Sequence, residues 1–107
     1  MNDTYLQASQ KLIAAINKLD EAFKAASTLD AKDKIYSAME VIQDELNALI
    51  AAGLKDNAAQ YEAQTQIFKD SKAELEKLKN QIDTLISFIK IASEVISTLS
   101  SVIALIP

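Results

Sequence analysis

The 107-residue chain contains no histidine, cysteine, tryptophan or arginine. Without histidine and cysteine, the usual zinc sites, thiol nucleophiles, Ser-His-Asp triads and His-ligated haem are excluded, as are Glu-x-x-His di-iron sites. Without arginine there is no planar fork for bidentate binding of phosphate or carboxylate. The missing cysteines also exclude disulfides, so cysteine content does not separate a cytosolic from an exported protein. We therefore expect a non-enzymatic protein with no metal and no cofactor.

Glycine and proline are almost as scarce, since Gly53 is the one glycine and Pro107, the last residue, is the one proline. A β-protein of this length would need several turns built from such residues. The chain is instead rich in alanine, leucine, isoleucine, lysine, glutamate and glutamine, which form helices well. The sequence predicts an all-α fold in a single domain spanning residues 1–107.

Acidic residues outnumber basic ones, since the chain has fifteen acids, eleven lysines and a formal net charge of −4. Nucleic-acid binding requires a positively charged face, which this interleaved pattern does not supply, so no nucleic-acid partner is expected. The acids occur in small clusters closely followed by lysines, which is typical of a solvated helix surface rather than a catalytic pair. These clusters are Asp20/Glu21, Asp30/Asp33, Glu40/Asp44/Glu45 and Glu74/Glu76.

The strongest pattern lies in the last third of the chain. Apolar residues recur there at alternating steps of three and four: Leu75, Leu78, Ile82, Leu85, Ile89, Ala92, Ile96, Leu99, Ile103 and Ile106. A second apolar row runs beside them: Phe88, Ile91, Val95, Val102 and Leu105. The pattern predicts one long helix, apolar over more than half its circumference, which other helices, a second copy or lipid must cover. Lys90 and Glu94 are its only charges in this apolar part, spaced so that they can touch.

A second amphipathic helix is predicted near the start of the chain. Its seam is Leu12, Ile16, Leu19, Phe23 and Ala26, and Asn2, Asp3 or Thr4 can cap it. The apolar phase shifts within residues 27–34, where Thr28 or Asp30 could cap a new helix. Because neither glycine nor proline stands there, a phase slip inside one continuous helix remains an alternative.

Gly53 is the clearest helix stop, because glycine readily adopts the left-handed conformation that ends helices. The polar segment that follows, residues 57–69, has no helix breaker, so we expect a helix to run through it. Alternatively, Asp70 or Ser71 could cap a new helix, and Ser71 with Glu74 fits a capping box. Two architectures follow. One is an antiparallel hairpin, or coiled coil, of two helices of nearly fifty residues; the other is a three- or four-helix bundle of shorter helices.

A central glycine turn in a chain of about this length, followed by Tyr61 and Phe68 and the seam of Leu75, Leu78, Ile82 and Leu85, resembles the WXG100 family. These ESAT-6-like substrates of type VII secretion are helical hairpins that dimerise. The family's tryptophan is replaced here by Ala51, and its C-terminal Tyr-x-x-x-Asp/Glu export signal is absent. The resemblance therefore implies a small bacterial, secretion-linked assembly partner and no particular functional residue.

These patterns favour a protein that associates with copies of itself or with a partner helix through residues 82–106. The expected anchors are Phe88, Ile91, Val95, Ile96, Leu99 and Val102. The alternative is a membrane-interacting protein, such as a pore-forming toxin component, that inserts this helix. Tyr36 and Tyr61 could be further interface anchors or ordinary boundary residues. The first residues lack the basic and apolar regions of a signal peptide, so localisation is open between the cytoplasm and export without a classical signal.

Overall fold

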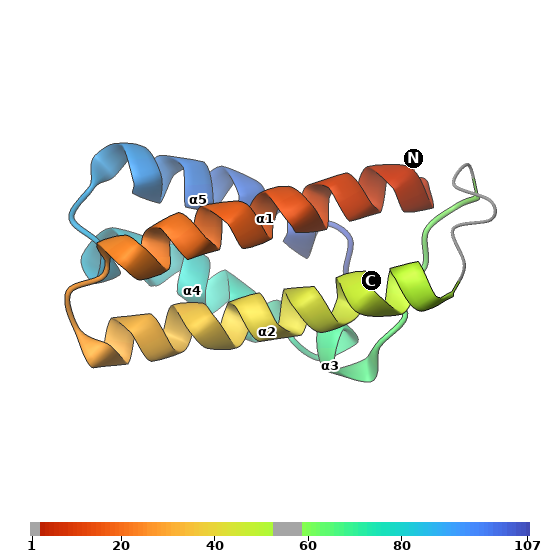
Figure 1. The fold of residues 1–107 in the computed structure, drawn as a ribbon, viewed down its shortest axis with the longest axis horizontal. Helices are drawn as coiled ribbons and strands as arrows, with labels where there is room; N and C mark the ends of the chain where they lie inside the picture. The colour runs from red at the N-terminus through yellow and green to blue at the C-terminus, as the bar shows by residue number, and fades with distance from the viewer. Residues whose placement is uncertain (1–2, 53–58) are drawn as a thin grey trace.

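The computed structural model describes residues 3–52 and 59–107, which form an all-α bundle, as predicted (Figure 1). Its principal extents are 41 × 22 × 21 Å. The predicted turn at Gly53 lies outside the described residues. Within them the helices are α1 (Tyr5–Ala25), α2 (Leu29–Ala51), α3 (Gln66–Lys69), α4 (Lys72–Leu85) and α5 (Ile89–Ile103).

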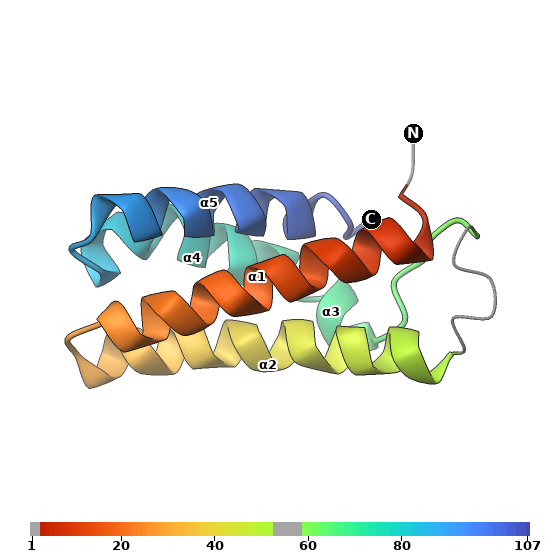
Figure 2. The same cartoon turned by 45° about the horizontal axis from the view of Figure 1, so that its top comes forward.

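The four longer helices run back and forth along the bundle (Figures 1 and 2). Helix α1 packs against both α2 and α5, and α5 packs against α4, whereas α2 and α4 touch only sparsely. The α1–α2 and α4–α5 turns lie at the same end of the bundle. The chain therefore forms the bundle of shorter helices, and not the hairpin of two helices of nearly fifty residues.

The first two helices begin where the sequence places capping residues. The Thr4 hydroxyl accepts a hydrogen bond from the Gln7 amide, and the Gln7 side chain accepts one from the Thr4 amide, which completes a capping box. Thr28 caps α2 by accepting from the Ala31 amide at 3.1 Å. Ala26 is extended, so α1 ends there, and the break that was one alternative for residues 27–34 is the one that occurs.

The prediction of a helix through residues 57–69 is wrong for residues 59–65, whereas residues 66–69 are helical. Backbone hydrogen bonds from Tyr5 to Ala59 and from Tyr61 to Asp3 hold an extended segment against the N-terminus. The short helix α3 follows. A new helix, α4, does begin at Lys72 with Ser71 at its N-cap, as one alternative predicted. The capping box does not form, because the Ser71 hydroxyl donates to the carbonyl of Phe68 instead.

The prediction of one long apolar C-terminal helix is also wrong. Helix α4 ends at Leu85 and α5 begins at Ile89, with Ile86 and Phe88 in extended conformations between them. The physical reason is burial: folding α5 back places its wide apolar face against α1 and α4, which covers more of that face than one neighbour could. Ala92, Val95, Leu99 and Val102 are at most 2% exposed as a result.

Candidate functional site

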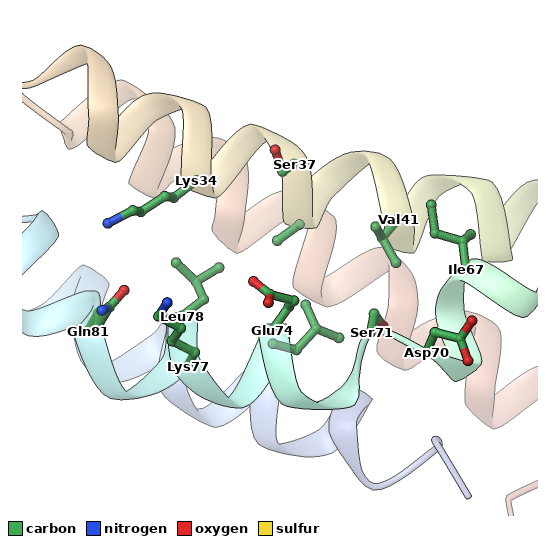
Figure 3. Close-up of a pocket in the computed structure, with 12 residues that line it drawn as sticks. Lys34, Ser37, Val41, Ile67, Asp70, Ser71, Glu74, Lys77, Leu78 and Gln81 are labelled. Atoms are coloured by element: carbon green, nitrogen blue, oxygen red, sulfur yellow. The ribbon is translucent and has the colours of Figure 1, made fainter.

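An open groove lies along the edge of the bundle where α2 and α4 diverge (Figure 3). Its volume is about 380 Å³. Ala38 and Val41 from α2 face Leu75 and Leu78 from α4, so most of its surface is apolar. The spacing of three within each pair places both side chains on the same face of their helix. Among the described helices, α1 packs closely on α2 and α5, and α4 on α5, whereas α2 and α4 leave the groove between them open.

Charged side chains divide the groove into two halves (Figure 3). Lys34 and Lys77 line one half, and Asp70 and Glu74 line the other. The Lys34 ammonium also pairs with Asp30 at 3.2 Å, one helical turn earlier on α2. The groove therefore has a positive and a negative half along an apolar floor, with equal numbers of charges of each sign.

Helix α3 closes one end of the groove. Thr65 caps it by accepting from the Phe68 amide at 3.2 Å, and Phe68 is fully buried beneath it. Ile67 points the other way, lines the end of the groove and is 53% exposed. Because α3 has only four residues, it cannot hold this position by its own helical hydrogen bonds.

A buried carboxylate fixes α3 to α2. Glu45 is fully buried and accepts four hydrogen bonds: from the Tyr61 hydroxyl at 2.6 Å, the Gln64 amide at 2.8 Å, and the Thr65 amide and hydroxyl at 2.8 and 2.9 Å. A buried carboxylate is stable when its oxygens are fully bonded in this way. Glu45 therefore joins the C-terminal third of α2 to the chain that leads into α3.

The ring of Tyr61 completes this anchor. It is 7% exposed and stands edge-on to Tyr5, with ring centroids 5.7 Å apart. Burial, together with the hydrogen bond to Glu45, raises the pKa of Tyr61 well above its usual range. Tyr61 is thus an internal anchor, whereas Tyr36 is 53% exposed and lies beside Phe23.

The prediction that Glu45 belongs to a solvated acidic cluster is wrong. It follows Ile42 by three residues and precedes Leu49 by four, so helical spacing puts it on the buried face of α2. That spacing was the available sign of a buried role. The sequence gives no sign of its partners, because Tyr61, Gln64 and Thr65 reach it only after the chain has reversed direction.

The six anchors predicted from the C-terminal pattern are divided between core and surface. Val95, Leu99 and Val102 are fully buried against the chain's own helices. Ile91 and Ile96 are partly buried beside them, and Phe88 is 59% exposed. The chain itself covers most of the surface that the pattern assigned to a partner, while the groove between α2 and α4 was not anticipated.

The pairing of charges on α5 also differs from expectation. Glu94 forms its ion pair with Lys18 of α1, although the sequence suggested Lys90. The hydrogen bond from Lys18 lowers the pKa of Glu94, and the hydrogen bonds to Glu94 and Glu21 raise the pKa of Lys18. This pair marks where α1 and α5 meet at the surface.

Among the described residues, no group of three or more side chains is arranged to hold a metal ion. In the ranges 3–52 and 59–107, no helix combines the length and the apolar character needed to cross a membrane.

Comparisons of the chain with protein-family models, with curated proteins and with solved structures found no match. The resemblance to the WXG100 family stays a prediction.

Proposed function

We propose that this chain is a non-enzymatic helical protein that binds an amphipathic helix of a protein partner. The observation that supports the proposal is the apolar groove between α2 and α4. Exposed apolar surface that is bordered by polar residues is typical of protein interaction sites. The partner helix would lie against α2 and α4, in the groove that none of the described helices fills.

A helix suits the groove because its walls are themselves two helices lying side by side (Figure 3). In this mode of recognition, the partner presents apolar residues at steps of three and four to an apolar floor. Val41 of α2, which is partly buried, and Ile67 of α3, which is 53% exposed, would contact those residues. Burial of apolar surface would therefore supply most of the affinity, and charge would set the orientation of the partner helix.

The two charged halves specify that orientation. An acidic side chain at one end of the partner helix would pair with Lys34 and Lys77, and a basic one at the other end with Asp70 and Glu74. Complementary charges of this kind affect orientation and association rate more than affinity. The balance of signs favours a partner that carries both charges over a nucleic acid or another uniformly charged ligand. The WXG100 resemblance adds the proposal that the partner belongs to a secretion system.

The probe for this proposal is a pair of synthetic helical peptides with identical apolar residues, one that is acidic at one end and basic at the other, and one that is basic at both ends. Their binding to the isotope-labelled protein is followed by NMR. The peptide whose acidic end meets Lys34 and Lys77 should shift the amide signals of α2 and α4 around the groove. We expect the peptide that is basic at both ends to bind at least about tenfold more weakly, equivalent to roughly 1.4 kcal/mol, because a basic end meets Lys34 and Lys77 in either direction of binding.

A pair of variants locates the binding site. Val41→Asp places a charge on the apolar wall and should abolish binding of the matched peptide. Ile13→Asp changes a residue on α1 that is 46% exposed and does not line the groove, so binding should persist. Equal binding of both peptides, or binding that survives Val41→Asp in the folded protein, would contradict the proposal.

A further inference from the structure

The turn between α4 and α5 lacks the residues that normally end and begin helices. Ile86, Ser87 and Phe88 connect the two helices, without glycine or proline. Phe88 occupies the N-cap of α5, and its ring has no oxygen to accept a hydrogen bond from the first turn. Local sequence therefore does little to hold the chain in this bend.

The apolar repeat also runs through the turn without a change of phase. Steps of four, three and four join Leu85, Ile89, Ala92 and Ile96 across it, as they would in an uninterrupted helix. In the bundle this repeat is broken: Ile89 is 87% exposed although it belongs to the seam. Both a bent and a straight connection are thus compatible with the sequence.

We propose that α5 exchanges between two copies of this chain. The turn at 86–88 straightens, α4 and α5 become one continuous helix, and α5 packs on α1 and α4 of the second copy. A second copy is the partner that fits, because its α1 and α4 present the same surfaces that bury α5 within one chain. This inference goes beyond the proposed function, since it involves neither the groove nor a foreign helix.

Exchange preserves the contacts of α5 and changes only the turn. Val95, Leu99 and Val102 would be buried against the same side chains, now supplied by the other copy. Lys18 of one copy would pair with Glu94 of the other. What is gained is a set of helical hydrogen bonds through the turn, and cover for Ile89, which would face its counterpart near the two-fold axis. A short connection between exchangeable elements is the usual hinge for such swapping.

Proline at position 89 should be compatible with the bent connection and should disfavour the straight one. Ile89 is the first residue of α5, where proline suits a helix start, and Phe88 before it is extended as proline requires. In a straight helix the same proline would remove a hydrogen bond and clash with the preceding turn. Leu29→Pro is the matched control, because Leu29 is also the first residue of its helix, is 75% exposed and follows an extended residue.

The experiment refolds the full chain from denaturant at high protein concentration and measures its mass by light scattering. The wild type and Leu29→Pro should contain dimers that persist on dilution, whereas Ile89→Pro should be monomeric. A second pair of variants does not depend on proline. Ser87→Ala should dimerise about 25-fold more tightly than Ser87→Gly, because glycine disfavours each of two straightened turns by roughly fivefold.

Cross-linking shows whether α5 is the exchanged element. The variants Lys18→Cys and Glu94→Cys are refolded together and treated with a short bismaleimide. Since these positions are in contact between α1 and α5, exchange should yield dimers that join the two different variants. The cross-link should vanish when Ile89→Pro is added to both chains.

Two results would overturn the inference. One is a wild type that remains monomeric after refolding at the highest soluble concentration. The other is a dimer that Ile89→Pro leaves intact and that gives no cross-link between the two variants, which indicates ordinary association of folded bundles. Neither result changes the expected peptide binding at the α2–α4 groove, so failure of this inference and failure of the proposed function are distinguishable.

Discussion

The two turns at one end of the bundle, residues 26–28 and residues 86–88, connect similar pairs of antiparallel helices by different means. At the first turn the Thr28 hydroxyl caps α2 and Asp30 stands in its first turn, where the helix dipole favours an acid. At the second turn Phe88 occupies the N-cap, and the apolar repeat continues in phase. One bend is encoded locally, and the other depends on what α5 packs against.

We therefore expect the turn at residues 86–88 to straighten more readily than the turn at residues 26–28. A bend fixed by a cap and a phase change has no competing straight form with a buried seam. A bend held by burial persists only while its apolar face stays covered, and a second copy can provide the same cover. Four sets of substitutions test this contrast, and they are given in order of decreasing expected effect.

Leu99→Ala should destabilise the protein most. Leu99 lies in the middle of the buried face of α5 and is fully buried. Truncation leaves a cavity and should lower the free energy of unfolding by about 2–5 kcal/mol, measured by urea denaturation. Ile89→Ala is the control on the same helix and should change it by less than about 0.5 kcal/mol, because Ile89 is 87% exposed. Equal losses would show that burial is not what holds α5.

Tyr61→Phe tests the connection into α3, which a polar anchor fixes instead of a cap or an apolar face. Loss of the hydrogen bond to Glu45 should lower the free energy of unfolding by about 1.5–3 kcal/mol at neutral pH. Tyr36→Phe, at an exposed hydroxyl, should change it by less than about 0.5 kcal/mol.

The raised pKa of Tyr61 predicts that the stability difference between wild type and Tyr61→Phe depends on pH. The pKa of Tyr61 is raised in the folded protein, so its contribution is complete below the pKa of an unfolded tyrosine and declines above about pH 10. The difference in stability between wild type and Tyr61→Phe should therefore narrow as the pH rises through this range. A difference that stays constant would contradict the assigned cause of the shift.

An alanine substitution in each turn compares the two turns most directly. Thr28→Ala removes a cap and should lower the free energy of unfolding by about 1 kcal/mol. Ser87→Ala removes an exposed side chain from an uncapped turn and should change it by less than about 0.5 kcal/mol. Both changes in the free energy of unfolding should be measured by urea denaturation of dilute, monomeric protein. Matching losses would mean that Ser87 contributes to its turn as Thr28 does.

The smallest effect is expected at the ion pair between α1 and α5. Because Lys18 lowers the pKa of Glu94, the stabilisation is present at neutral pH and is lost as the pH falls through the lowered pKa. Glu94→Gln should slightly lower the melting temperature at neutral pH and leave it unchanged in acid. A loss that persists in acid would show that Glu94 acts through a contact other than its charge.

Prediction from sequence succeeded where the signal is local. The scarcity of glycine and proline indicated helices, Thr4 and Thr28 were among the predicted caps, and the phase change at residues 27–34 marked a real break. The long C-terminal helix was predicted wrongly because nothing local interrupts its repeat. Helical spacing alone cannot show that the face of α5 is covered by α1 and α4.

The groove and its anchor were missed for a related reason. Val41 and Leu78 belong to separate helices, and only the divergence of α2 and α4 turns them into facing walls. Glu45 is satisfied by donors sixteen to twenty residues later in the chain, so no local pattern identifies them. Sites made by chain reversal and helix divergence are properties of the assembled fold.

Native-state hydrogen exchange tests most directly whether one turn is held locally and the other by burial. The comparison sets the third and fourth amides of α2, at Ala31 and Lys32, against those of α5, at Ile91 and Ala92. After correction for intrinsic rates, the α5 amides should exchange at least about fivefold faster, because a cap is worth about 1 kcal/mol in the first turn. Equal or slower exchange in α5 would contradict the account.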